Sequence, residues 1–189
     1  MTPDIYIVKV NSPIDENTFR LLLRFVQPEK KERILKQRLK QNADNMLIGE
    51  ILAKSAIKKI FGIPIAKQEF SLGEHGKPYL KDFPNIHFNI SHSGEYVVCC
   101  VSDKPIGIDI QKIGKYNPGV AKKVCNEKEL KEIEESLDKA AEFTKLWTQK
   151  EAVLKRDGTG FANKDVKNCL DGEKAEVEKI GDYYLSVAR

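Results

Sequence analysis

The chain has 189 residues, of which 41% are hydrophobic and 32% are charged, a composition that excludes a disordered chain and fits a folded globule. The formal net charge of +4 favours an anionic ligand or an acidic partner, and it is too small to argue for nucleic acid. The apolar runs are far shorter than the ~20 residues of a transmembrane helix, so we expect no membrane segment. This length predicts one domain, or two small halves that share a core.

The cysteines and the N-terminus bear on the compartment. Cys99 and Cys100 lie in an apolar run and are expected to be core thiols, and no pair of the four cysteines has the two-residue gap of a zinc or redox motif. The first ten residues lack the basic segment and apolar core of a secretory signal. These features predict a reducing compartment, the cytoplasm.

The first third of the chain is predicted to form one strand and three helices. The strand covers 4–10, and the helices cover 16–26, 28–40 and 42–62. Pro28 fits the first position of a helix, and Gly62 fits the residue that follows the end of one. The helix that begins at Pro28 is strongly basic, which indicates either a solvated face or a collar for phosphate groups.

The remaining two thirds alternate between strands and helices. Three short strands over 86–91, 96–101 and 106–111 are joined by turn-rich connections and predict an antiparallel meander.

Two helices are expected next, over 127–135 and 139–157, and then two weaker strands over 167–172 and 183–189. Asn126 and Glu129 form a capping-box pattern at the start of the first helix, and Gly158 ends the second. This order of elements predicts an α+β fold, with helices packed on mainly antiparallel sheets.

Two segments from the predicted meander carry polar side chains. In "NISHSG", Ser91 and His92 lie where a strand leaves the sheet, and taken alone His92 is a hydrogen-bonded turn residue. In "GIDIQ", Asp109 and Gln111 share one face of a strand, where they could hold a metal ion or simply face water.

A third segment, "LWTQKEAVLK", places Glu151 and Lys155 four residues apart on one face of a helix. They could form an intrahelical ion pair, or they could supply a metal-binding carboxylate and a phosphate-binding ammonium. Together the three segments offer two carboxylates, a histidine and lysines, which suit a Mg²⁺-assisted reaction on a phosphate ester.

The segments "FNISHSG", "PIGIDIQ" and "LWTQKEAVLKRDGTG" resemble the signature segments of the 4′-phosphopantetheinyl transferases, specifically the single-chain, pseudo-dimeric, surfactin-synthetase-activating type. The similarity runs from about residue 5 to about residue 162. It implies an enzyme that moves phosphopantetheine from coenzyme A to a serine of an apo acyl or peptidyl carrier protein, releasing adenosine 3′,5′-bisphosphate. It also implies a monomer with two similar α/β halves related by a pseudo-twofold axis, over 1–105 and 106–189, with coenzyme A and Mg²⁺ in the cleft between them.

The resemblance assigns roles at the metal. Asp109 and Glu151 match the magnesium ligands, and Gln111 stands on the same strand face where the family commonly has a glutamate. Glu151 or a metal-bound water would take the proton from the carrier serine. Lys155 matches the lysine that contacts the coenzyme A phosphates near the reacting centre, and Glu129 matches an acidic position close to the site.

The resemblance also assigns the nucleotide contacts. Lys77, Ser91 and His92 match positions that hold the nucleotide and its phosphates, and Lys30 and Arg33 match positions that reach the 3′-phosphate. Close relatives carry a hydroxyl residue in place of Met46.

Two rival readings remain from the sequence. One is a degenerate relative that binds coenzyme A or a carrier protein without chemistry, which only Gln111 supports. The other is a small basic nucleic-acid binder, which the modest charge does not favour.

Overall fold

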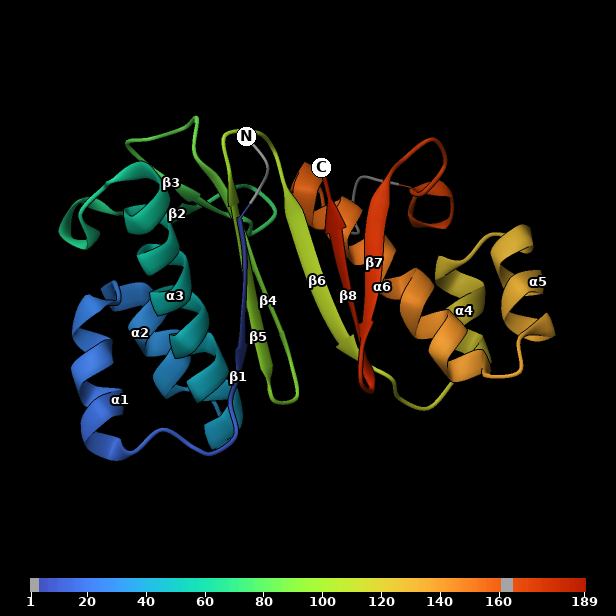
Figure 1. Ribbon diagram of the computed structural model, residues 1–189, viewed down its shortest axis with the longest axis horizontal. Coiled ribbons are helices and arrows are strands. Elements are labelled where there is room, and N and C mark those ends of the chain that lie inside the picture. Colours follow the sequence, from blue (N-terminus) through green and yellow to red (C-terminus); the bar gives the residue numbers. More distant parts are fainter. Residues whose placement is uncertain (1–3, 161–164) are drawn as a thin grey trace. The chain divides into compact units, whose positions relative to one another are not determined.

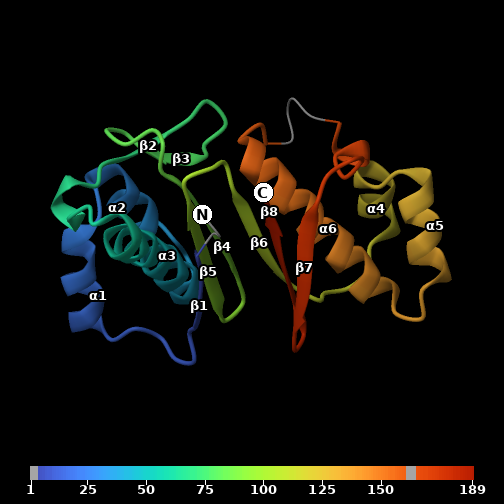
Figure 2. The ribbon, with the colours of Figure 1, turned by 45° about the horizontal axis from the view of Figure 1, so that its top comes forward.

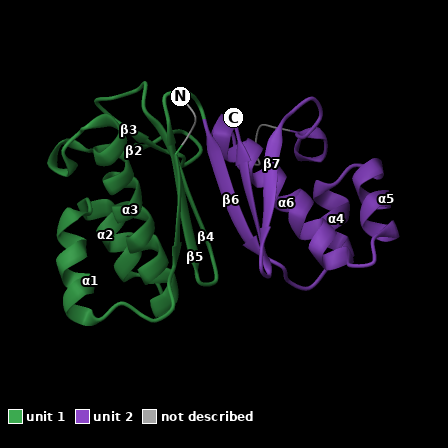
Figure 3. Cartoon of the chain, in the orientation of Figure 1, with its two compact units in different colours: residues 1–105 green, residues 106–189 purple. Residues whose placement is uncertain are grey.

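The structure is a computed structural model that describes residues 4–160 and 165–189. The chain divides into two compact units, residues 1–105 and 106–189 (Figure 3). Each unit contains a three-stranded antiparallel sheet with a long helix packed on it, which confirms the predicted α+β class. None of the helices in the described ranges is both long and apolar enough to cross a bilayer.

The sheet of the first unit has the strand order β1-β5-β4. Its strands are β1 (Asp4–Lys9), β4 (His87–Ser93) and β5 (Tyr96–Ser102), and β4 and β5 form an antiparallel hairpin that pairs Ile90 with Cys99. Cys99 and Cys100 are fully buried, as predicted. A separate two-stranded sheet joins β2 (Phe70–Leu72) to β3 (Pro78–Leu80).

Three helices complete the first unit. The long helix α3 (Lys40–Phe61) packs on β4 and β5, while α1 (Glu16–Leu22) and α2 (Pro28–Leu35) pack against α3 (Figure 1). Pro28 occupies the first turn of α2, and Gly62 ends α3 with a left-handed φ of 71°, both as predicted. Met46 packs against a core cluster that includes Phe19, Leu47 and Val26.

The second unit is built on β6 (Gly107–Lys112), β7 (Ala175–Ile180) and β8 (Tyr183–Ala188), in the order β6-β8-β7. The helix α6 (Lys139–Asp157) packs on all three strands, and α5 (Glu127–Glu135) packs on α6 (Figure 2). The expected capping box of Asn126 and Glu129 is present, and Gly158 ends α6 with a φ of 69°. A short helix, α4 (Pro118–Val124), precedes α5.

The predicted three-stranded meander is wrong at its third strand. β6 pairs with β8 and not with β5, so it belongs to the second sheet. The reason lies in how closely β6 contacts α6. A Cβ atom built on Gly107 would lie 2.0 Å from the carbonyl oxygen of Ala152, so only a glycine allows the two backbones to approach this closely.

The predicted strand at 167–172 is also wrong. That segment contains the end of a 3₁₀ turn (Val166–Asn168) followed by turns, and the strand lies further on, at Ala175–Ile180. β7 is an edge strand in which half-buried and exposed residues largely alternate. Because its exposed positions are charged, the segment lacks the run of apolar residues that would have indicated a strand. The last strand, β8, confirms the prediction for the C-terminus.

Candidate active site

Asp109 lies in the middle of β6 and is only 1% exposed, between Ile108 and Ile110, which are fully buried. Two donors reach its carboxylate. Lys155 Nζ lies 2.5 Å from Oδ1, and Gln111 Nε2 lies 3.0 Å from Oδ2. The aspartate therefore does not simply face water, which was one of the two roles that the sequence allowed.

Lys155 and Glu151 come from neighbouring turns of α6, the helix that covers β6. Lys155 forms its ion pair across the packed elements, with Asp109, while its side chain stays 28% exposed. The close contact at Gly107 fixes β6 against the same stretch of α6, since its nearest atoms belong to Ala152 and Arg156. The local packing thus brings Asp109, Gln111, Glu151 and Lys155 into one cluster.

Glu151 has the most telling electrostatics of the cluster. Burial raises its pKa, the negative charge of Asp109 raises it further, and nearby Lys155 opposes them, so that the pKa of Glu151 reaches about 7. A buried carboxylate whose proton affinity is raised further by a second carboxylate nearby marks a site that a divalent cation would stabilise.

The residues present fit a magnesium ion. Mg²⁺ usually takes only one or two protein carboxylates and completes its octahedron with phosphate oxygens and water. Asp109 and Glu151 are such a pair. Within residues 4–160 and 165–189, no group of three or more His, Cys, Asp or Glu side chains is placed to hold a metal. This donor set suits magnesium better than zinc, which prefers Cys and His ligands.

Glu129 has a structural role in this arrangement. Its Oε2 accepts from the backbone N–H of Asn126, and its Oε1 forms an ion pair of 2.8 Å with Lys150 Nζ. Lys150 is fully buried and also donates to the carbonyl oxygens of Val166 and Lys167, at 3.0 and 2.8 Å.

Lys150 was not predicted from the sequence. A lysine among the apolar positions of α6 was the available signal, because a buried ammonium needs several acceptors. Lys150 directly precedes Glu151 in α6. Its ion pair with Glu129 therefore holds this turn of α6 to α5, and its hydrogen bonds to Val166 and Lys167 hold the same turn to the 3₁₀ turn.

The first unit holds a pocket of about 160 Å³, named the cationic pocket after Lys30 and Arg33, although Glu29 and Glu50 line it as well. Its apolar lining includes Phe70, Pro78 and Ile90. Burial lowers the pKa of Lys30, and the charge of Glu50 opposes that shift. Burial likewise raises the pKa of Glu50, and Lys54 and Lys30 oppose it. The pocket therefore combines apolar walls with charged groups of both signs, and its two cations suit a ring system that carries phosphate.

The structure brings some of the expected nucleotide contacts to this pocket. Lys30 and Arg33 line it directly, and Lys77 lies between Gly76 and Pro78, which also line it. On β4, side chains alternate between faces, so His92 shares the face of Ile90 while Ser91 points to the other. Ser91 is 5% exposed, and its side chain is not on the pocket side of the sheet.

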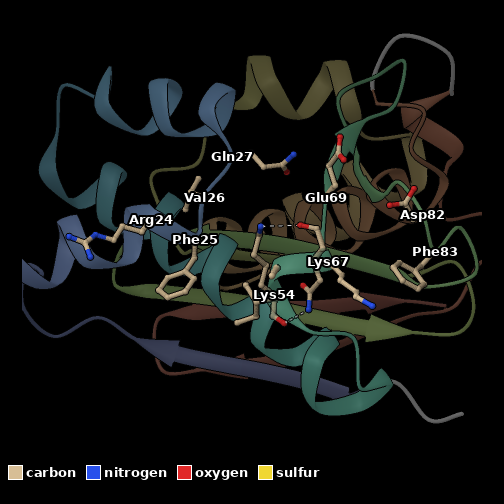
Figure 4. Close-up of a pocket in the computed structure, with 12 residues that line it drawn as sticks. Arg24, Phe25, Val26, Gln27, Lys54, Lys67, Glu69, Asp82 and Phe83 are labelled. Carbon is tan, nitrogen blue, oxygen red and sulfur yellow. Dashed lines mark hydrogen bonds between the residues drawn. The ribbon is translucent and has the colours of Figure 1, made fainter.

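A second, larger pocket of about 670 Å³ adjoins the cationic pocket in the same unit (Figure 4). It shares Gln27 with the cationic pocket, and Gln27 Oε1 accepts from the backbone N–H of Phe70 at 2.8 Å. Lys54 is buried beneath it and donates to the carbonyl oxygen of Gln68 at 3.2 Å. Gln68 in turn donates to the carbonyl oxygens of Lys54 and Ile63, so these polar groups stabilise the scaffold.

Comparison with known proteins identifies the class. Residues 12–104 match the family model described as 4′-phosphopantetheinyl transferase, N-terminal, and residues 105–182 match that of the 4′-phosphopantetheinyl transferase superfamily. The chain belongs to this superfamily, and the prediction that it is a 4′-phosphopantetheinyl transferase is confirmed.

Several similar proteins are themselves named as phosphopantetheinyl transferases. The chain is 32% identical over 160 residues to 4′-phosphopantetheinyl transferase Sfp of Bacillus subtilis (strain 168), an alignment that covers 84% of this chain and 71% of the relative. It is 35% identical over 160 residues to 4′-phosphopantetheinyl transferase gsp of Aneurinibacillus migulanus, covering 84% and 67%. A mouse relative, L-aminoadipate-semialdehyde dehydrogenase-phosphopantetheinyl transferase, is 31% identical over 157 residues, covering 75% and 51%.

Proposed function

We propose that this phosphopantetheinyl transferase takes 4′-phosphopantetheine from coenzyme A and attaches it to a serine of an apo acyl or peptidyl carrier protein. The reaction requires Mg²⁺ and releases adenosine 3′,5′-bisphosphate. The observation that carries the proposal is the cluster of Asp109, Glu151 and Lys155, which offers two carboxylates and an ammonium on packed elements of one unit.

Asp109 and Glu151 would hold the magnesium ion. When bound, Mg²⁺ supplies Lewis-acid stabilisation of the pyrophosphate charge and a template for the phosphate oxygens. Asp109 suits this role because it is fixed on a buried strand. Burial raises the pKa of Glu151, and repulsion from Asp109 raises it further. The ion would offset this repulsion between the two carboxylates.

Lys155 would contact the phosphoryl group that is transferred. Its ammonium is partly exposed on a flexible stem, so it can leave Asp109 for a phosphate oxygen. In the reaction the serine oxygen forms a bond to phosphorus, and the bond from phosphorus to the bridging oxygen of the pyrophosphate breaks. A cation placed at this group stabilises the charge that grows in the transition state.

Glu151 would accept the proton of the carrier serine. The carboxylate has two oxygens, so one can serve the ion while the other takes the proton. Deprotonation strengthens the serine oxygen as a nucleophile.

In the first unit, Lys30 and Arg33 would bind the 3′-phosphate of coenzyme A. Both line the cationic pocket, whose apolar walls suit the adenine ring. Lys77 and His92 would add contacts to the nucleotide. Ser91, whose side chain points to the other face of the sheet, would act through its backbone. We further propose that the enzyme acts as a monomer in the cytoplasm; its four cysteines, all buried thiols, support a reducing compartment.

Transfer is tested by incubating the chain with coenzyme A, MgCl₂ and a panel of apo carrier proteins. Mass spectrometry should show a carrier that gains one phosphopantetheine group, and EDTA should abolish the gain. Asp109→Asn and Glu151→Gln should lower the rate by about 1000-fold or more while circular dichroism stays native.

Glu142→Gln is the matched control, because Glu142 lies on the same helix and pairs with Lys145 near the surface. It should keep the wild-type rate. Full activity of either site variant would contradict the assignment of the metal ligands. Binding of coenzyme A without transfer to any carrier would instead favour a binding module.

A further inference from the structure

Gln111 stands beside the expected magnesium ligand, and its amide group has a defined orientation. Its Nε2 lies 3.0 Å from Asp109 Oδ2. An ionised carboxylate can only accept hydrogen bonds, so the group that faces it must be the NH₂ and not the carbonyl oxygen. The atom of Gln111 that could ligate Mg²⁺ is therefore turned away from Oδ2.

The two oxygens of Asp109 thus meet different kinds of donor. Oδ1 accepts from Lys155, whose long, flexible side chain is 28% exposed. Oδ2 accepts from Gln111, a shorter, half-buried side chain two residues along the same strand. The hydrogen bond from Gln111 joins two residues of the same strand, β6. Lys155, in contrast, lies on α6 and could leave Asp109 to bind a phosphate group.

We propose that Gln111 is a positioning residue, which fixes the Asp109 carboxylate through Oδ2 and leaves Oδ1 to the exchangeable cations, and that it is not itself a magnesium ligand. Partners that orient a ligand in this way typically change metal affinity by 10- to 100-fold when they are removed. The inference rests on the proposed function only for its magnesium arm, because the contact to Asp109 exists without the metal.

The first test measures the contact itself. The side-chain NH₂ signal of Gln111 is assigned by ¹⁵N NMR through its loss in Gln111→Met. It should shift in Asp109→Asn, and its hydrogen exchange should remain slower than that of a solvent-exposed amide both in EDTA and with saturating Mg²⁺. Exchange that rises to the solvent rate when Mg²⁺ is added would overturn the proposal, since a ligand would turn its oxygen to the ion and release Asp109.

The second test measures metal affinity with Mn²⁺, by the loss of its free-ion electron paramagnetic resonance signal. Gln111→Met keeps the length of the side chain without the donor, and it should weaken Mn²⁺ binding about tenfold.

Gln149→Met is the matched control. Gln149 belongs to the same unit, and its Nε2 donates to the carbonyl oxygen of Ala175 at 2.9 Å, away from Asp109. This variant should leave Mn²⁺ affinity unchanged. Equal Mn²⁺ affinity in wild type and Gln111→Met would overturn the positioning role. Neither test requires transfer to a carrier, so their outcome is separate from that of the proposed reaction.

Discussion

Asp109 illustrates how the role of one residue depends on its partners. The alternation of "GIDIQ" left open whether this carboxylate bound a metal or faced water. In the structure it is almost fully buried, with Lys155 at one oxygen and Gln111 at the other. This buried position, beside a lysine from a different element, supports the role of magnesium ligand that we propose for Asp109.

The raised pKa of Glu151 makes the stability of the metal-free protein depend on pH. The folded pKa of about 7 lies above the usual value of 4.5, so the folded state binds the proton more tightly than the unfolded state does. This contribution is full below about pH 4.5 and is lost as the pH rises through about 7. Glu151→Gln should therefore be more stable than wild type at pH 8 by about 2 kcal/mol, after allowance for solvent screening, with little gain at pH 4.5.

Thermal unfolding in EDTA at the two pH values measures this effect. Asp109 and Lys155 are the charged groups that act on Glu151, and both remain in the variant. Glu142→Gln should show no comparable pH-dependent gain. An equal effect of Glu151→Gln at both pH values would mean that the carboxyl group is not perturbed.

The thiols offer a second test at this scale. Burial, together with the charge of Glu129, raises the pKa of Cys125 to about 11, and the other three cysteines are buried as well. Because the thiolate is the reactive form, none of the four should react with Ellman's reagent at pH 8 in the native state. All four should react in denaturing urea. Rapid reaction in native buffer would contradict the buried positions.

How much of the site could be predicted from sequence differs between residues. The i, i+4 spacing placed Glu151 and Lys155 on one face of a helix, but it could not show that Lys155 pairs with Asp109, because that contact joins residues 46 positions apart. The structural role of Glu129 depends on Lys150, which lies 21 residues away. The spacing of residues in a sequence predicts contacts only within one helix or strand. It could therefore not predict these two contacts between residues far apart in the chain.

At the level of elements, the contact between β6 and α6 carries the site. Gly107→Ala would place a Cβ atom 2.0 Å from the carbonyl oxygen of Ala152 and 2.4 Å from the amide nitrogen of Arg156. Backbone atoms cannot give way cheaply, so we expect a loss of about 3 kcal/mol or more of unfolding free energy, together with lost activity. Urea denaturation measures the loss.

The control for this substitution is Gly114→Ala, just beyond the same strand. There the nearest atom to a new Cβ, the carbonyl oxygen of Lys112, lies 3.9 Å away, so the cost should be below about 1 kcal/mol. Similar stability of the two variants would show that β6 does not approach α6 this closely.

Elements with strong end signals were predictable, and elements that depend on distant pairing were not. Pro28, Gly62, Asn126 and Gly158 mark helix ends through local backbone chemistry, and each lies where the sequence placed it. The turn before β6 shows that the chain bends, but not that the strand joins a different sheet. Asn117 and Pro118 were a usable signal for α4, since the side chain of Asn117 caps that helix.

Across the whole molecule, charge is unevenly divided. The entire surplus of positive charge belongs to residues 1–105, because lysines and arginines equal acidic residues in number over 106–189. If the partner is an acidic carrier protein, this surplus should speed the encounter. Raising NaCl from about 50 to about 300 mM should then lower kcat/KM for the carrier about fivefold.

Steady-state labelling at several salt concentrations measures this dependence. The value of kcat at saturating carrier should change little, because the steering acts on association. A kcat/KM that does not depend on salt would mean that the net charge plays no part in recognition. The length of the chain allowed two halves, but the position of their boundary came from the resemblance alone, since no composition shift or linker in the sequence marks it.

The ion pair between Lys155 and Asp109 has a consequence for the order of events. In the metal-free chain the ammonium group of Lys155 neutralises the carboxylate of Asp109. A metal ion that binds Asp109 would take over this role. If Asp109 holds magnesium as proposed, the ion alone would have to compete with Lys155, whereas coenzyme A that binds together with the ion would offer its phosphates to the lysine. We therefore expect Mn²⁺ to bind weakly before coenzyme A and tightly with it, and Lys155→Met to bind Mn²⁺ more tightly than wild type when coenzyme A is absent. The enzyme would thus assemble its charged centre only around its substrate.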